Sequence, residues 1–295
     1  MDLRGLLTYL PVKRFKSPPP IVAVVRLVGV IGAVGPWRGG LTLAGLDPAI
    51  ERAFKLRRLQ AVALAINSPG GSPTQSDLIA RRIRDLAQEK GVPVLAFCED
   101  VAASGGYWLA CAADEIYARE TSVVGSIGVI AAGFGFPELL QRIGVERRVY
   151  TAGDKKAMLD PFQAEKRGDV DRLKVLQKDV HESFMATVRE RRGARLKGGE
   201  KTLFSGEFWS GKRAVELGLV DGVGEMRQIL RARYGDRVVL RRVDAGRPWW
   251  RRRIGMAAED AAGTWPVLRR PDPRDWFAGL IAAVEERALW SRFGF

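Results

Sequence analysis

The sequence predicts an α/β protein with a parallel sheet and crossover helices, followed by a separate C-terminal extension. Apolar runs at residues 21–30, 61–66 and 92–97 have the length and composition of buried strands. A helix with an apolar stripe is expected over residues 73–89, between the second and third of these runs. Strands that alternate with helices of this length indicate parallel strands joined by crossovers.

The remaining elements follow the same alternation. We expect further strands at residues 115–118, 123–131, 145–150 and 237–243, and helices at residues 137–143, 161–192, 211–217 and 225–234. A short helix is expected to begin at Asp47, with Pro48 in its first position. Three segments result: a basic, proline-ended lead-in at 1–20, the α/β domain at 21–243 and an extension at 244–295.

Composition excludes several function classes. The 295 residues contain 48 Lys and Arg against 34 Asp and Glu, a formal net charge of +14, yet no nucleic-acid-binding motif accompanies this charge. Contact with an anionic membrane surface and an ordinary basic exterior remain open. Cys98 and Cys111 lack metal-ligand spacing, so we expect buried thiols and neither a metal nor a cofactor.

No segment is predicted to cross a membrane. Residues 21–35 form the most apolar early run, but this run contains Arg26 and is shorter than the ~20 residues that a spanning helix needs. The first ten residues are too short an apolar stretch for a secretory signal. We therefore expect a cytoplasmic protein with peripheral contact at the inner membrane.

Ser104 is the candidate nucleophile. It follows the apolar run at 92–97 and opens the segment Ser-Gly-Gly-Tyr-Trp, where a helix is expected to start. Backbone N–H groups at a helix entry lack intrahelical acceptors and favour negative charge. A serine in this position still needs a base.

A lysine is the candidate base. The only histidine, His181, lies on a long polar helical stretch without an acidic partner at a suggestive spacing. Lysine can replace histidine when its surroundings favour the neutral amine. The loop Gly-Asp-Lys-Lys places Lys156 52 residues after Ser104, and its neighbour Lys155 remains an alternative.

Two glycine-rich segments complete the candidate site. The segment Asn-Ser-Pro-Gly-Gly ends at Gly71 after an apolar strand, and its glycines allow close approach of the backbone to a ligand. The N–H groups of Gly71 and Gly105 could form an oxyanion hole. Ser126, between Gly125 and Ile127, offers a hydroxyl that could hold an amine.

With these motifs in view, the chain resembles the bacterial signal peptide peptidase family SppA, of the ClpP/crotonase superfamily. The resemblance covers about residues 20–243 and implies a ClpP/crotonase-like fold. It implies Ser104 as nucleophile, Lys156 as general base, Ser126 as the hydroxyl that orients the amine, and Gly71 as an oxyanion donor. It also implies a homo-oligomer that hydrolyses hydrophobic peptides, such as released signal peptides, with a Ser-Lys dyad.

Three other functions stay open. A ClpP-like or NfeD-type peptidase shares the glycine-rich strand end, although ClpP needs a histidine soon after the serine. A crotonase-type acyl-CoA enzyme would use the same backbone oxyanion hole. A non-catalytic membrane-associated scaffold would act through the extension.

The extension has its own composition. Residues 244–295 contain five of the eight tryptophans, interleaved with arginines. An amphipathic helix is expected over residues 276–293, with Trp276, Leu280, Val284 and Ala288 along one side. Such a segment suits a membrane interface or the groove of a partner subunit.

Overall fold

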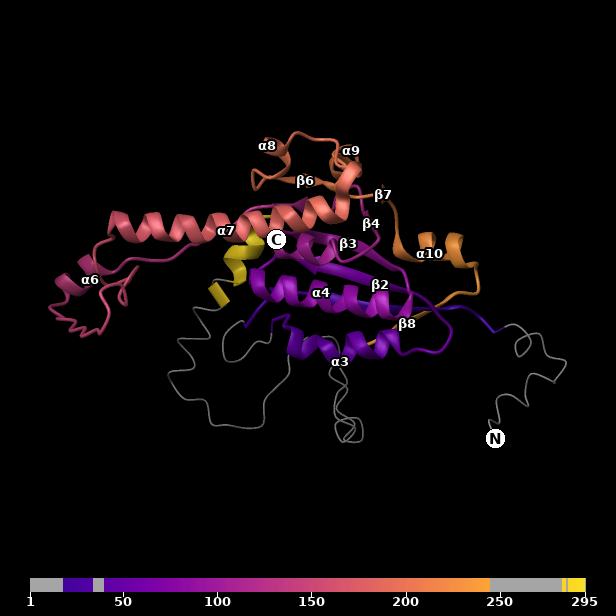
Figure 1. Ribbon diagram of the computed structural model, residues 1–295, viewed down its shortest axis with the longest axis horizontal. Helices are drawn as coiled ribbons and strands as arrows, with labels where there is room; N and C mark the ends of the chain where they lie inside the picture. Colours follow the sequence, from indigo (N-terminus) through magenta and orange to yellow (C-terminus); the bar gives the residue numbers. More distant parts are fainter. Residues whose placement is uncertain (1–17, 34–39, 245–282, 285, 295) are drawn as a thin grey trace, which may run out of the picture.

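The computed structural model describes residues 18–33, 40–244, 283–284 and 286–294 (Figure 1). Most of the predicted extension, including Trp276 and Leu280, lies outside the described residues, as does most of the lead-in. Within the described ranges, every helix is too short or too polar to cross a membrane.

A mixed, mostly parallel sheet forms the centre of the protein, which confirms the predicted fold class. Its strands follow the order β6-β5-β3-β2-β1-β8, while β4 pairs with β3 and β7. Only the pairing of β5 with β6 is antiparallel among the described strands. The strands are β1 Ile21–Val28, β2 Leu59–Ser68, β3 Val94–Ala103, β4 Glu115–Ala118, β5 Val123–Gly125, β6 Phe208–Ser210, β7 Gly222–Val223 and β8 Val239–Arg242.

Helices connect and cover these strands. The longest two, α4 and α7, lie on the same side of the sheet as α3 and α5 (Figure 1). Their bounds are α3 Leu43–Phe54, α4 Pro73–Lys90, α5 Gly105–Ala110, α6 Pro137–Arg142, α7 Arg167–Arg192, α8 Glu200–Leu203, α9 Gly211–Glu216 and α10 Met226–Tyr234. The opposite face of the sheet packs against α10.

Strand β3 belongs to two ladders. Its first half pairs with β4 from Leu95 to Cys98, and its second half pairs with β5 from Val101 to Ala103. Because β2 pairs with β3 on the other side along most of its length, the end of β3 is held between neighbours on both sides. That end leads directly into Ser104.

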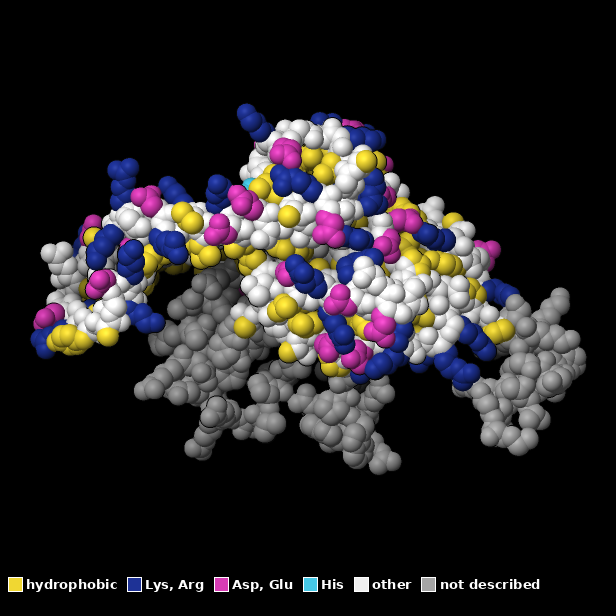
Figure 2. Space-filling view, viewed as in Figure 1, with side chains coloured by type: hydrophobic (Ala, Val, Ile, Leu, Met, Phe, Trp, Pro, Cys, Tyr) yellow, Lys and Arg dark blue, Asp and Glu magenta, His cyan; other side chains and the backbone are white. Residues whose placement is uncertain are grey.

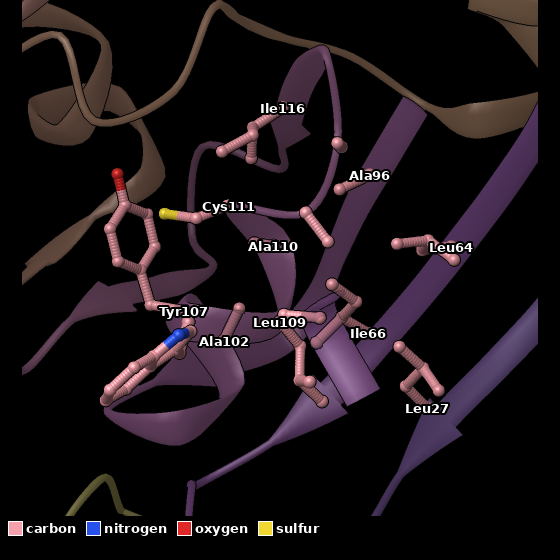
Figure 3. Packing of buried hydrophobic residues seen from close by; sticks show 14 of the residues in the cluster. Leu27, Leu64, Ile66, Ala96, Ala102, Tyr107, Leu109, Ala110, Cys111 and Ile116 are labelled. Carbon is pink, nitrogen blue, oxygen red and sulfur yellow. The ribbon is translucent and has the colours of Figure 1, made fainter. Parts of the chain in front are cut away.

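The main hydrophobic core joins the sheet to α5. Tyr107, Leu109 and Ala110 from α5 belong to the same buried cluster as Leu64 and Ile66 of β2 (Figure 3). The Tyr107 hydroxyl donates a hydrogen bond of 2.7 Å to the carbonyl of Leu219, so its one polar atom is satisfied inside the core. The helix that begins after Ser104 is therefore fixed by burial along its whole length.

Several local expectations are wrong. The first helix begins at Leu43, not at Asp47, because the Thr42 side chain accepts the Gly45 N–H and caps it, and Pro48 lies inside it. Residues 145–150 form no strand, since all six are exposed and none of the described strands pairs with them. The predicted strand at 123–131 stops at Gly125, and β6 was not expected.

The predicted apolar stripe of α7 is covered over only part of its length. Phe184 and Val188 are buried against the core, but Leu176, two turns earlier, is exposed. The N-terminal half of α7 therefore projects beyond the sheet (Figure 1).

A buried ion pair fixes the other end of α7. Arg192 is only 2% exposed, and its guanidinium donates to Asp221 at 2.7 and 3.1 Å. The Asp221 carboxylate also accepts the Ile116 N–H at 2.7 Å. Burial raises the pKa of Asp221, but the hydrogen bonds from Arg192 and Ile116 and the charge of Arg195 outweigh it, so the pKa is lowered.

We expect Asp221→Asn to lower the free energy of unfolding by about 3 kcal/mol at neutral pH, because it leaves the Arg192 charge buried without its counterion. A lowered folded-state pKa stabilises the protein above the unfolded value and loses that effect as pH falls through the folded pKa. The difference from the unsubstituted protein should therefore shrink below about pH 4. Urea denaturation of both proteins at several pH values measures this difference in the free energy of unfolding.

Asp77→Asn is the matched control, because Asp77 pairs with the exposed Arg81 on the surface of one helix. This substitution should lower the free energy of unfolding by less than about 0.5 kcal/mol. An Asp221→Asn protein as stable as this control would show that the ion pair does not hold α7 in place.

Candidate active site

Ser104 occupies a strained turn between β3 and α5. Its φ of 52° and ψ of −122° are rare for a residue with a side chain. The conformation is held from both sides, because the Ser104 N–H donates to the Gly125 carbonyl at 2.8 Å and the Ser104 carbonyl accepts the Trp108 N–H at 3.0 Å. Such strained strand-to-helix turns are a common way to present a nucleophilic serine.

The glycines around Ser104 are required by close backbone packing. A methyl group on Gly70 would lie 2.8 Å from Cβ of Ser104, and one on Gly106 would lie 2.4 Å from the Ser68 carbonyl oxygen. A methyl group on Gly105 would lie 2.5 Å from Oγ of Ser76. The two glycine segments predicted from the sequence therefore pack directly against each other.

Two backbone N–H groups remain available beside Ser104. Ile31 donates to the Gly70 carbonyl and accepts the Ser72 N–H, both at 2.8 Å, so the alternation of an extended chain directs the Gly71 N–H away from Ile31. Gly105 is the first residue of α5, and its N–H has no intrahelical acceptor. Among the described backbone hydrogen bonds, neither N–H has an acceptor.

Ser126 lies at the end of the neighbouring strand. Ala103 pairs with Gly125, so Ser104 and Ser126 each follow one member of the same cross-strand pair. Ser126 also has a positive φ, 53°, and is 4% exposed. Its N–H donates to the Glu207 carbonyl at 2.6 Å, which ties the turn to the residue before β6.

Asn67 holds this edge of the sheet in register, and the sequence analysis missed it. Its side chain donates to Asp100 at 2.7 Å and accepts the Val101 N–H at 3.2 Å. These bonds span the irregularity between Ile66 and Ser68, where the register of β2 against β3 shifts. The available signal was an amide side chain at a buried strand end, immediately before the glycine-rich turn.

Lys155 and Lys156 lie on a separate part of the molecule. We call residues 130–166 the arm; it contains α6 and leads into the projecting half of α7 (Figure 1). Both lysines are exposed in a turn, where the Lys156 N–H donates to the Gly153 carbonyl at 3.1 Å. No described contact joins either lysine to Ser104, so the chain brings together Gly71, Ser104, Gly105 and Ser126 but not Lys156.

The arm is held together mainly by its own contacts. The Phe136 ring lies 6.3 Å from Phe134 and 5.8 Å from Phe162, and the Arg147 guanidinium stacks 4.8 Å from the Phe162 ring. Arg147 also pairs with Asp160. The hydrogen bonds described for residues 134–163 stay within this segment or reach the start of α7.

Most of the exposed large apolar side chains of the described chain lie on the arm and the adjacent half of α7. The Phe134 side chain is 72% exposed and the Tyr150 side chain 90%. Figure 2 shows apolar side chains at the tip of this region and along the lower side of α7. The set is Ile130, Phe134, Phe136, Leu139, Ile143, Val145, Val149, Tyr150, Leu159, Phe162, Val175 and Leu176.

The other reactive side chains have structural positions. His181 is half-buried, with Nε2 3.0 Å from the Ile127 carbonyl oxygen. Cys98 and Cys111 are free and buried, and burial raises the pKa of each thiol to about 12. Thiols that stay protonated are poor nucleophiles. In the described part of the chain, no group of three or more potential metal ligands gathers.

A cavity of about 660 Å³ lies on the α10 side of the sheet, away from Ser104. Its walls are apolar side chains such as Val24 and Phe97, with charged residues such as Arg26 and Glu99 among them. Arg26 and Glu99 form an ion pair of 3.0 Å across the strands. Gly71, Ser104, Gly105 and Ser126 do not line this cavity.

A serine at a strained strand end, beside two available N–H groups, is the arrangement of a serine hydrolase with a backbone oxyanion hole. The model of peptidase family S49 matches residues 86–236, which include Ser104, Ser126 and both lysines. The chain belongs to this family of serine-type peptidases.

Similar proteins differ in name and length. The chain is 49% identical over 293 residues, 99% of its length, to a protein of Brucella abortus named Na(+)/H(+) antiporter NhaA, of which it covers 39%. It is 33% identical over 171 residues to a putative signal peptide peptidase SppA of Enterococcus faecium, covering 57% of this chain and 48% of that protein. The chain thus spans less than half the length of these curated relatives.

Two further likenesses are weaker in sequence or partial in length. A chloroplastic serine protease SPPA of Arabidopsis thaliana is 32% identical over 213 residues, 69% of this chain and 30% of that protein. Among solved structures, a 1510-N membrane-bound stomatin-specific protease in complex with a substrate peptide is 14% identical, with a TM-score of 0.49 over 90% of this chain and 100% of that one.

We expect Gly71→Ala to destabilise the protein by about 3 kcal/mol, because the added methyl group meets a backbone atom at a positive φ of 140°. That methyl group would lie 2.1 Å from the Ile31 carbonyl oxygen. Gly168→Ala is the control, since a methyl group there has nothing within 4 Å and Gly168 lies in a helix. Thermal unfolding of the two variants compares them, and equal melting temperatures would contradict the close approach.

Proposed function

We propose that this chain is a serine endopeptidase that hydrolyses hydrophobic peptides, such as released signal peptides, with a Ser-Lys dyad. The observation that supports this most strongly is Ser104, held at a strained turn with the Gly71 and Gly105 N–H groups beside it. Membership of peptidase family S49 supports the reaction class. The name of the Enterococcus relative supports the substrate class.

The proposed reaction begins with attack of Ser104 Oγ on the carbonyl carbon of the scissile bond, while its proton moves to the neutral amine of Lys156. The negative charge that develops on the carbonyl oxygen is stabilised by the N–H groups of Gly71 and Gly105. Lys156 then protonates the leaving amine, and an acyl ester remains on Ser104. Water, deprotonated by the same lysine, hydrolyses the ester and restores the serine.

The base is proposed to come from a neighbouring copy of the chain. A lysine that accepts protons must be shielded from water, because desolvation disfavours the ammonium form. Lys156 is exposed on the arm, and so is the apolar surface around it. A homo-oligomer in which the arm covers the active site of the next copy would bury both the apolar surface and the lysine.

Ser126 fits a role in orienting that amine. It is buried at the end of the strand next to Ser104, and its backbone is fixed by the hydrogen bond to Glu207. A hydroxyl held this way could accept a hydrogen bond from the lysine Nζ.

The proposed contact with an anionic membrane stays a prediction. It depends mainly on the tryptophan- and arginine-rich stretch at residues 245–282, which lies outside the described residues. The antiporter name of the Brucella relative belongs to a protein of which this chain matches 39%, and it adds no activity to the proposal.

We expect Ser104→Ala and Lys156→Ala each to lower peptidase activity by about 10⁴-fold or more, because nucleophile and base act as a unit. Lys155→Ala, on the adjacent and equally exposed residue, is the matched control and should keep most activity. A fluorophosphonate probe should label Ser104 in the unsubstituted protein. Loss of activity with Lys155→Ala but not with Lys156→Ala would show that Lys155, and not Lys156, is the base.

We expect a mixture of the two inactive variants to recover activity after subunit exchange. Copies with Ser104→Ala still supply Lys156, and copies with Lys156→Ala still supply Ser104. A random 1:1 mixture should reach about 25% of the unsubstituted activity, since one neighbouring pair in four is complete. Mixed assemblies that form, as native mass spectrometry would show, but stay inactive would place both groups within one chain.

A further inference from the structure

The described end of the C-terminal extension packs on the chain's own sheet. Residues 286–291 are helical (Figure 1, yellow). The chain then turns, and Phe293 is buried, with 8% of it exposed. Val284 and Ala288, which belong to the apolar side predicted from the sequence, are exposed. Trp290 and Phe293 therefore form the contacting side of this helix and turn.

Phe293 contacts three adjacent strands. It forms a buried cluster with Val101 and Ala103 of β3, against which Val123 of β5 also packs. Its ring meets that of Phe208 in β6 edge-on, with centroids 5.2 Å apart and an interplanar angle of 75°. One aromatic side chain thus bridges the ends of β3, β5 and β6.

These strand ends position both serines of the candidate site. Ala103 pairs with Gly125, and Gly125 pairs with Phe208, so the three residues form one row across the sheet. Ser104 follows the first member of the row and Ser126 follows the second. Phe293 packs against this row on the face opposite the main core.

The row needs such a contact because two of its three strands are short. β5 and β6 contain three residues each, so few ladder hydrogen bonds hold them together. Short strand pairs are marginal without packing on their faces. Val124 and Trp209 pack into the main core on one face, and Phe293 is a buried side chain of the cluster on the other.

We propose that Phe293 is a positioning residue, which holds the row of Ala103, Gly125 and Phe208 so that Ser104 and Ser126 keep their geometry. The residue acts through these strand ends and touches no reacting atom. The inference rests on the proposed function of Ser104 as nucleophile. The positioning itself is a property of the fold and can be measured separately.

The test compares three full-length variants with the unsubstituted protein. Phe293→Ala removes the ring, and Phe293→Leu keeps most of its apolar volume. Val284→Ala truncates another apolar side chain near the C-terminal end of the chain, one that is 54% exposed. Amide hydrogen exchange of peptides spanning residues 123–127 and 207–210 reports the strand ends. Peptides from β1 and β2 report the rest of the sheet.

With Phe293→Ala we expect exchange at residues 123–127 and 207–210 to rise at least about 10-fold, while β1 and β2 stay protected. The rate of Ser104 labelling by a fluorophosphonate and kcat for a short peptide should fall by a similar factor, with little change in KM. Phe293→Leu should restore most of the protection from exchange and most of the labelling rate and kcat. Val284→Ala should leave all three unchanged.

Three results would overturn the proposal. Unchanged exchange at the strand ends would show that Phe293 does not hold them. A rise in labelling or kcat with Phe293→Ala would make the C-terminal end an obstruction of the site. Faster exchange of the whole sheet, not rescued by Phe293→Leu, would reduce the role to general stability. If the unsubstituted protein is not labelled at Ser104, the proposed function fails, while the exchange data still decide whether Phe293 holds the strand ends.

Discussion

The close approach of two backbone segments, residues 70–71 and residues 104–106, is the constraint on which the rest of the candidate site depends. The Ser68 carbonyl, Cβ of Ser104 and Oγ of Ser76 occupy the space that side chains on these glycines would need. This packing brings the backbone of residues 70–71 next to Ser104 and Gly105. Asn67 bridges β2 and β3 where their register shifts, next to the point where the two segments meet. The positions of these glycines around Ser104 therefore depend on sheet register.

The surroundings of Ser104 and the arm differ in how they are packed. Ser104 lies where β3 is paired on both sides and where α5 is buried along its length. The arm, by contrast, packs mainly against itself and leaves large apolar side chains exposed. The ion pair between Arg192 and Asp221 fixes the end of α7 that lies at the core. The projecting half of this helix and the arm are therefore attached to a fixed element.

The sequence was sufficient for the central parallel strands, although not for β6 or β7, and for the grouping of four of the five proposed site residues, whose roles stay predictions. Apolar runs and glycine-rich strand ends report such local requirements. Gly71, Ser104, Gly105 and Ser126 meet at one edge since parallel strands end together. The position of Lys156 was not predictable in this way. The apolar stripe of α7 is continuous, and nothing in its periodicity tells which half the core covers. Phe293 was missed for a related reason, because its contacts depend on three strands that are distant in sequence.

The arm also has a consequence for control of the activity. If the base belongs to a different copy from the nucleophile, a single chain in isolation is inert, and no inhibitor or pro-segment is needed to keep it so. Activity would then rise more steeply than in proportion to protein concentration, and dilution alone would switch the enzyme off. Newly made chains would remain harmless to neighbouring polypeptides until enough copies had accumulated to assemble.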